Sequence, residues 1–171
     1  IDVESEPGQG SCFEVLIDLK IAGDRSVSLS SQAETDEPDD NILQGMHFLC
    51  AEDNELNAEI LMELLKIEGA ACTICENGEK ILEAFEQSVP GDYDMILMDV
   101  QMPVMNGYEA AKAIRSSSHE LAKKIPIIAM TANAFSEDIQ HSLAVGMNAH
   151  ISKPVDMKTL EKTVRSIKSG G

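Results

Sequence analysis

Four apolar runs of the sequence end in residues that can act on a phosphoryl group. These residues are Glu52 with Asp53, Asp99, Thr131 and Lys153. Carboxylate oxygens suit a hard divalent cation such as Mg²⁺, and a carboxylate can itself attack a phosphoryl group. A lysine and a hydroxyl can neutralise and hold the oxygens of that group. The residue types therefore predict Mg²⁺-dependent phosphoryl transfer, provided that the fold brings the four run ends together.

The stretch from residue 46 to residue 168 alternates short apolar runs with segments of helical periodicity. The predicted strands are 46–51, 70–75, 95–98, 125–130 and 149–152. The first helical segment has the apolar residues Leu56, Ile60, Leu64 and Ile67 at helical spacing and is expected to end at Gly69. Five β–α units in succession predict an α/β fold, a flavodoxin-like doubly wound sheet of five parallel strands in the order 2-1-3-4-5 with helices on both faces.

The predicted sheet explains why residues distant in the sequence can act together. All strands of a parallel sheet end at the same edge, and ligands bind where the strand order reverses. In the order 2-1-3-4-5 this point lies between the first and third strands, which places Asp53 beside Asp99. Carboxylates gathered in this way repel one another unless a cation lies between them. The fold and the acids together predict a metal site.

Composition excludes several classes of partner. The formal net charge is −17, and such an acidic surface repels nucleic-acid phosphates. No apolar stretch reaches the ~18 residues of a membrane span, so this fragment is expected to make no membrane contact and to be cytoplasmic, although a longer parent protein can be membrane-anchored. Cys72 and Cys75 lie three residues apart in a predicted strand, where they face opposite sides, so we expect core thiols rather than a zinc site.

Segment 45–168 resembles the receiver domains of two-component signalling along its whole length. The matching pieces are Ala51-Glu52-Asp53-Asn54, Met98-Asp99-Val100-Gln101-Met102-Pro103-Val104-Met105-Asn106-Gly107, Met130-Thr131-Ala132-Asn133-Ala134 and Ser152-Lys153-Pro154. The resemblance implies that Asp99 is the phosphoacceptor, and that Thr131 and Lys153 contact the phosphoryl oxygens. It implies that Mg²⁺ is held by Glu52, Asp53, Asp99 and the backbone carbonyl of Gln101. It also implies a cis peptide bond before Pro154.

The same resemblance implies a place in a phosphorelay. A histidine kinase phosphodonor domain would supply the phosphoryl group from a phosphohistidine, and the aspartyl phosphate would be hydrolysed or relayed to a histidine phosphotransfer domain. The parent resembles a histidine protein kinase. This fragment lacks the ATP site, so it is expected to catalyse only its own aspartyl phosphorylation and dephosphorylation.

The first residues resemble the end of another domain. The segment Pro7-Gly8-Gln9-Gly10-Ser11-Cys12-Phe13 precedes an alternating apolar run, and the two together resemble the last glycine box and final strand of a histidine-kinase ATP-binding domain. The expected organisation is a kinase remnant at 1–21, an acidic flexible linker at 22–44, the receiver at 45–168 and a tail at 169–171. Without its parent sheet, the remnant strand is expected to be an unpaired edge.

Two other functions fit parts of this pattern. A receiver that is never phosphorylated can serve as an interaction module, but such a receiver is expected to lack Asp99, Lys153 or the acid pair. Phosphatases of the haloacid dehalogenase type also use Asp, Thr, Lys and Mg²⁺. Their nucleophile follows the first strand and has a second Asp two residues later, whereas here Gln101 takes that second position after Asp99.

Overall fold

The computed structural model of the chain describes residues 2–6, 10–14, 41–132 and 136–170. Contacts within the chain divide it into two compact units, Ile1–Asp39 and Asp40–Gly171. Each unit is described by itself. None of the helices in the described ranges combines the length and the apolar character needed to cross a bilayer.

The first unit contains a β-hairpin rather than a single strand. Strand β1 (Asp2–Glu6) pairs antiparallel with β2 (Gly10–Glu14). The prediction of an unpaired edge is therefore wrong for residues 10–14, because the preceding segment supplies a partner strand. The rest of the predicted remnant and most of the predicted linker, residues 15–40, lie outside the described residues.

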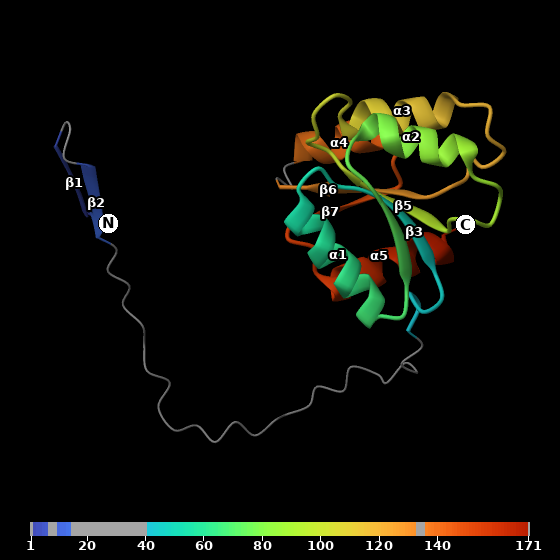
Figure 1. Ribbon diagram of the computed structural model, residues 1–171, viewed down its shortest axis with the longest axis horizontal. Helices are drawn as coiled ribbons and strands as arrows, with labels where there is room; N and C mark the ends of the chain where they lie inside the picture. The colour runs from blue at the N-terminus through green and yellow to red at the C-terminus, as the bar shows by residue number, and fades with distance from the viewer. Residues whose placement is uncertain (1, 7–9, 15–40, 133–135, 171) are drawn as a thin grey trace, which may run out of the picture. The chain divides into compact units, whose positions relative to one another are not determined.

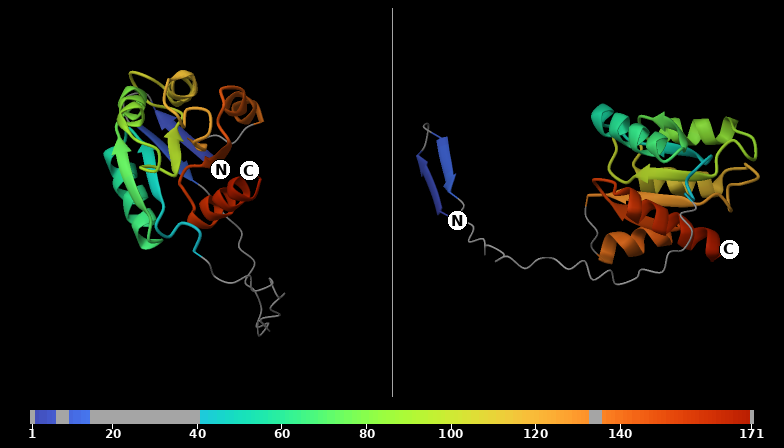
Figure 2. Two further views of the ribbon diagram at one scale, coloured as in Figure 1. Left: turned by 90° about the vertical axis from the view of Figure 1, so that its right-hand side faces the viewer. Right: turned by 90° about the horizontal axis from the view of Figure 1, so that it is seen from below.

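The second unit contains five strands and five helices in alternation (Figure 1). Its strands are β3 (His47–Ala51), β4 (Ala71–Cys75), β5 (Met95–Asp99), β6 (Ile127–Thr131) and β7 (Ala149–Ser152). Its helices are α1 (Glu55–Ile67), α2 (Gly78–Gln87), α3 (Gly107–Ser116), α4 (Ser136–Ala144) and α5 (Met157–Ser169). The two further views in Figure 2 show these helices packed around the sheet.

The five strands form one parallel sheet in the order β4-β3-β5-β6-β7. Numbered within the unit, this is the predicted order 2-1-3-4-5, and the fold class is confirmed. The first strand in sequence, β3, lies between β4 and β5, so the strand order reverses beside it. At the carboxyl edge, the register pairs Asp99 with Met130, and Thr131 with Ser152.

The first turns of four helices are fixed by short polar side chains. Asn54, Asn77, Asn106 and Asp156 each accept a hydrogen bond from the backbone N–H three residues later. Such N-caps satisfy amide groups that have no partner inside the helix. At α3 the cap is reciprocal, because the Glu109 side chain also accepts from the backbone N–H of Asn106. These caps fix where each helix leaves the carboxyl edge of the sheet.

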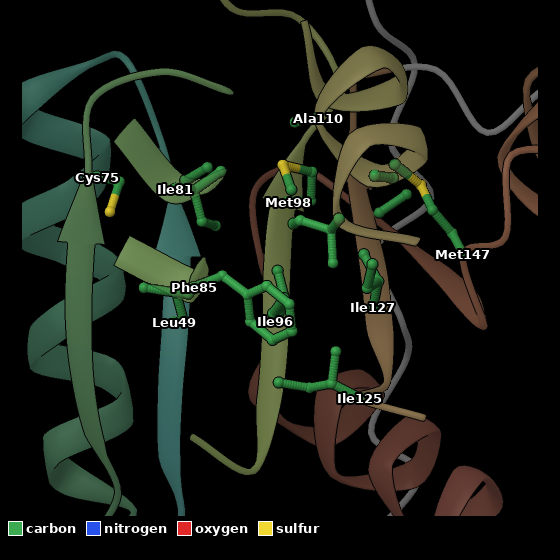
Figure 3. Close-up of a cluster of buried hydrophobic side chains, with 14 of the residues drawn as sticks. Leu49, Cys75, Ile81, Phe85, Ile96, Met98, Ala110, Ile125, Ile127 and Met147 are labelled. Carbon is green, nitrogen blue, oxygen red and sulfur yellow. The ribbon is translucent and has the colours of Figure 1, made fainter. Parts of the chain in front are cut away.

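The sheet is covered on both faces by apolar side chains. One cluster joins the sheet to α2 and α3, and Figure 3 shows Ile81 and Phe85 of α2 pointing toward Leu49 and Ile96 of the strands. The other cluster joins the opposite face to α1 and α5. Cys75 belongs to the first cluster, and Cys72 packs against the second, so the two thiols face opposite sides as predicted. Cys72 is only half-buried.

Helix α1 buries a different side from the one that the spacing suggests. The residues in its core contact are Ala58, Leu61 and Leu65. By contrast, Leu56, Ile60 and Ile67 are 64%, 51% and 76% exposed. The apolar spacing correctly predicted a helix, but most of the residues that carried the prediction lie on its solvent side. Gly69 follows the helix with φ of +72°, a left-handed conformation that glycine adopts without strain.

Candidate functional site

The ends of four strands bring the predicted site residues to one edge of the sheet. Glu52 and Asp53 follow directly after β3, Asp99 and Thr131 are the last residues of β5 and β6, and Lys153 follows β7. Because β3, β5, β6 and β7 are successive neighbours in the sheet, their ends form a continuous row. The predicted convergence of the strand ends is therefore observed.

Three carboxylates gather within this row. One oxygen each of Glu52, Asp53 and Asp99 lies within 4.8 Å of the others. Glu52 and Asp99 are buried, whereas Asp53 is exposed. A set of oxygen ligands that is open on one side suits a hard cation that keeps some of its waters, as Mg²⁺ does. The donor chemistry therefore fits a magnesium ion.

Lys153 binds the two buried acids. Its Nζ lies 2.6 Å from Oε2 of Glu52 and 2.8 Å from Oδ2 of Asp99. The lysine side chain is itself largely buried, with 21% of it exposed. One ammonium thus partly offsets the repulsion between two carboxylates that would be costly to bury without a countercharge.

The surroundings raise the pKa of both Asp99 and Lys153. Burial raises the pKa of the Asp99 carboxyl, and it outweighs the hydrogen bonds from Lys153 and the Gln101 amide, which lower it. For Lys153, burial lowers the pKa, but the hydrogen bonds to Asp99 and Glu52 outweigh burial, so the net pKa is raised. The ammonium therefore stays charged at neutral pH. Burial of the ionised Asp99 carboxylate costs free energy, and a cation bound beside it would lower this cost.

Asn57 is a contact that the sequence did not identify. Its side-chain Nδ2 donates to Oε1 of Glu52 over 3.0 Å. Helical spacing does not predict this contact, because Glu52 lies before Glu55, the first residue of α1. An asparagine in a first turn is ordinarily assigned to capping, and here Asn54 takes that role.

Thr131 and Gln101 share a pocket with one of the three acids. Both line a pocket of about 390 Å³ with Asp53 and Tyr108. The backbone N–H of Gln101 donates to Oδ1 of Asp99 over 3.0 Å, which leaves the role of its carbonyl as a metal ligand a prediction. The matching pair Asn133 and Ala134, just beyond Thr131, lies outside the described residues.

The loop after Asp99 is held close to the strand by a glycine. A Cβ at Gly107 would overlap the backbone oxygen of Asp99 and would lie 2.9 Å from Cγ of Met98. The Gly107 N–H donates to the carbonyl of Val100 over 3.0 Å. The missing side chain lets α3 begin against the end of β5. On the far side of the site, the Lys153–Pro154 peptide bond is cis, as the resemblance predicts.

The chain is similar in sequence and in structure to parts of known histidine kinases. The chain is 35% identical over 143 residues to a probable histidine kinase 2 of Oryza sativa subsp. indica, an alignment that covers 77% of the chain but only 14% of that relative. The receiver domain of the sensor histidine kinase PA1611 from Pseudomonas aeruginosa, solved with magnesium in its active-site cleft, is 34% identical. It superposes with a TM-score of 0.64 and covers 72% of this chain and 98% of that one.

A third similarity is to a receiver that was solved with its partner. It is the Saccharomyces cerevisiae receiver domain of Ssk1, crystallised with the histidine phosphotransfer protein Ypd1. It shows 29% identity, a TM-score of 0.61, and coverage of 70% of this chain and 86% of that one. The family model for the response regulator receiver domain matches residues 48–165. That range is more than half of the chain and contains Glu52, Asp53, Asp99, Thr131 and Lys153, so the chain belongs to the response regulator receiver domain family.

Proposed function

We propose that Asp99 accepts a phosphoryl group from a phosphohistidine, with Mg²⁺ held beside it by Glu52 and Asp53. The observation that carries this proposal is the buried Asp99 carboxylate, which contacts Lys153 and lies next to two further acids. Membership of the receiver family, which belongs to two-component signalling, supports it. The magnesium-bound receiver of Pseudomonas aeruginosa supports the identity of the ion.

The transfer step needs an oxygen nucleophile and charge neutralisation around phosphorus. An oxygen of Asp99 attacks the phosphorus as the phosphorus–nitrogen bond of phosphohistidine breaks. The electron pair of that bond stays on the imidazole nitrogen, and an acyl phosphate forms on Asp99. The Lys153 ammonium would balance part of the added charge, and the Thr131 hydroxyl would contact a phosphoryl oxygen. Glu52 and Asp53 would hold Mg²⁺, which would supply further charge neutralisation for the phosphoryl oxygens.

The proposed donor is a histidine phosphotransfer or phosphodonor domain that docks against α1. The α1 groove is defined here by Leu56, Ile60, Leu64 and Ile67, with Glu59 and Glu63 at its border. It shares Ile60 and Leu64 with a second pocket that reaches Glu52 and Lys153. A partner seated on the groove would therefore touch the rim of the phosphoacceptor site. The co-crystal of a similar yeast receiver with a phosphotransfer protein supports this type of partner.

The test is phosphorylation by a small acyl phosphate in the presence of Mg²⁺, followed by intact-protein mass spectrometry. We expect the chain to gain one phosphoryl group, and Asp99→Asn, which keeps the size of the side chain, to gain none. The gain should also disappear when Mg²⁺ is chelated. Equal gains in the two proteins would refute Asp99 as the acceptor. No gain in either would favour the alternative, a phosphorylation-silent receiver that serves as an interaction module.

A further inference from the structure

Glu52 has a buried carboxylate with both oxygens held by other side chains. Its side chain is 2% exposed, and each of its oxygens has a different partner. Oε2 pairs with Lys153, and Oε1 accepts a hydrogen bond from the side-chain amide of Asn57. A buried carboxylate needs such partners, because an unsatisfied oxygen away from water is costly.

Asn57 is held in place by its own helix. Its backbone N–H donates to the capping side chain of Asn54 over 3.0 Å, which fixes it in the first turn of α1. Its amide nitrogen, rather than its amide oxygen, must face Glu52, because a carboxylate only accepts hydrogen bonds. The contact thus joins the start of a rigid helix to a predicted metal ligand.

We propose that Asn57 is a positioning residue that holds the Glu52 carboxylate in place for the metal ion. The inference rests on the proposed function, since it assumes that the acid cluster binds Mg²⁺. Partners behind a metal ligand orient that ligand and commonly change metal affinity by about 10- to 100-fold when they are removed. Without Asn57, Lys153 is the remaining partner that the described contacts give to the Glu52 carboxylate, and the side chain can turn toward the ammonium and away from Asp53.

The same residue connects the site to the face of α1. Asn57, Glu52 and Lys153 line one pocket of about 360 Å³ together with Ile60 and Leu64 of the α1 groove. This pocket therefore joins the α1 groove to the metal site, and Asn57 is one of the residues that line it. A shift of the first turn of α1 would move the donor that fixes Glu52.

The experiment measures Mg²⁺ affinity by isothermal titration calorimetry on the full chain. We expect Asn57→Ala to weaken Mg²⁺ binding by about tenfold or more, and Asn57→Gln, which keeps the amide, to recover part of the loss. Phosphorylation by a small acyl phosphate should show the defect mainly as a higher Mg²⁺ requirement, with a smaller loss of rate at saturating Mg²⁺.

Thr159→Ala is the matched control. Thr159 holds the same position in the first turn of α5, and its hydroxyl donates to the capping carboxylate of Asp156 over 2.6 Å. It does not line the pockets that contain Glu52, Asp53 and Lys153. The substitution should leave Mg²⁺ affinity unchanged. Equal affinity in wild type and Asn57→Ala, or an equal loss in Thr159→Ala, would overturn the assignment of Asn57 alone. Absence of Mg²⁺ binding by the wild type would overturn the proposed function and this inference together.

Discussion

At the scale of single residues, the site is a balance of charge around Lys153. Two buried carboxylates share its ammonium, and a third, Asp53, lies within reach of the same point. One positive charge against three negative ones leaves an excess that a divalent cation can offset. Burial, which penalises the charged form, is the main reason why the pKa of Asp99 is raised, and repulsion from Glu52 adds to it. The charges that favour metal binding therefore cost stability when the metal is absent.

Replacing the lysine should reveal that cost. We expect Lys153→Met to lower the free energy of unfolding by about 3 kcal/mol at neutral pH without Mg²⁺, as removal of one partner from a buried ion pair does. Added Mg²⁺ should restore part of this loss. Urea unfolding with and without chelator measures both effects. The control is Lys80→Met, which breaks the exposed pair with Glu83 and should change stability little.

The stability loss caused by Lys153→Met should depend on pH, and the raised pKa of Asp99 sets the direction of that dependence. A carboxyl whose pKa is raised by folding contributes stability below its unfolded pKa, and this contribution is lost as the pH rises through the folded pKa. Asp99 behaves in this way, and without Lys153 its pKa should rise further. The loss caused by Lys153→Met should therefore shrink as the pH is lowered toward the acid range. A loss that stays constant with pH would contradict the charge argument.

The main site residues could be predicted at this scale, but not their pairing. Glu52, Asp53, Asp99, Thr131 and Lys153 follow from apolar runs that end in polar residues, and parallel strands bring such ends together. The sequence carries no sign that Glu52 would be shared between Lys153 and Asn57. That arrangement depends on the directions of three side chains from separate segments. These directions are set by the packing of the folded chain and cannot be predicted from spacing in the sequence.

At the scale of elements, α1 has two apolar stripes, and only one of them packs against the sheet. Ala58, Leu61 and Leu65 face the core, while the α1 groove lies on the solvent side. Both stripes have helical spacing, so periodicity alone predicts the helix but not which side is buried. An exposed apolar groove costs free energy in water, and a partner that covers it would recover that energy.

A charge placed in the α1 groove should separate docking from chemistry. We expect Ile60→Glu to slow phosphoryl transfer from a phosphorylated histidine phosphotransfer protein, such as yeast Ypd1, by at least about tenfold. Losing a hot-spot contact near the centre of an interface costs about 2 kcal/mol, and tenfold corresponds to ~1.4 kcal/mol. Phosphorylation by a small acyl phosphate should be unaffected, because Ile60 is 51% exposed and is not among the acids.

Val89→Glu provides the comparison for this test. Val89 is also an exposed apolar residue, at 61%, but it lies after α2 and outside the α1 groove. Quench-flow measurement of transfer should give the wild-type rate for this variant. If both glutamate variants slowed transfer equally, general electrostatic repulsion would explain the effect and α1 would lose its proposed role.

At the scale of the whole molecule, the second unit begins earlier than the predicted boundary at residue 45. Leu43 is fully buried, and the Asn41 side chain donates to the carbonyl of Glu68 over 2.9 Å. The acidic composition of the preceding residues suggested a linker that reached residue 44. Composition averages over a window, so it does not distinguish one buried leucine at the end of a polar stretch.

Two fragments test this boundary. A fragment of residues 41–171 should fold and accept a phosphoryl group on Asp99, whereas one of residues 45–171 should be less stable by about 2 kcal/mol, the value of burying a leucine side chain. Urea unfolding of the two fragments measures the difference. Identical stabilities would show that Leu43 adds nothing and that the predicted boundary at residue 45 is adequate.

The order of the strands along the sequence also affects how the site forms during synthesis. Within the second unit, a ribosome makes β3 first and β7 last, yet the residues that follow these two strands supply opposite charges to one site. A nascent chain therefore exposes Glu52, Asp53 and Asp99 long before Lys153 leaves the exit tunnel. During that interval the acids lack the Lys153 ammonium, and the proposed transfer to Asp99 would require β7 to dock first. A chain truncated before Lys153 would keep the three acids but would lack the ammonium that Glu52 and Asp99 share.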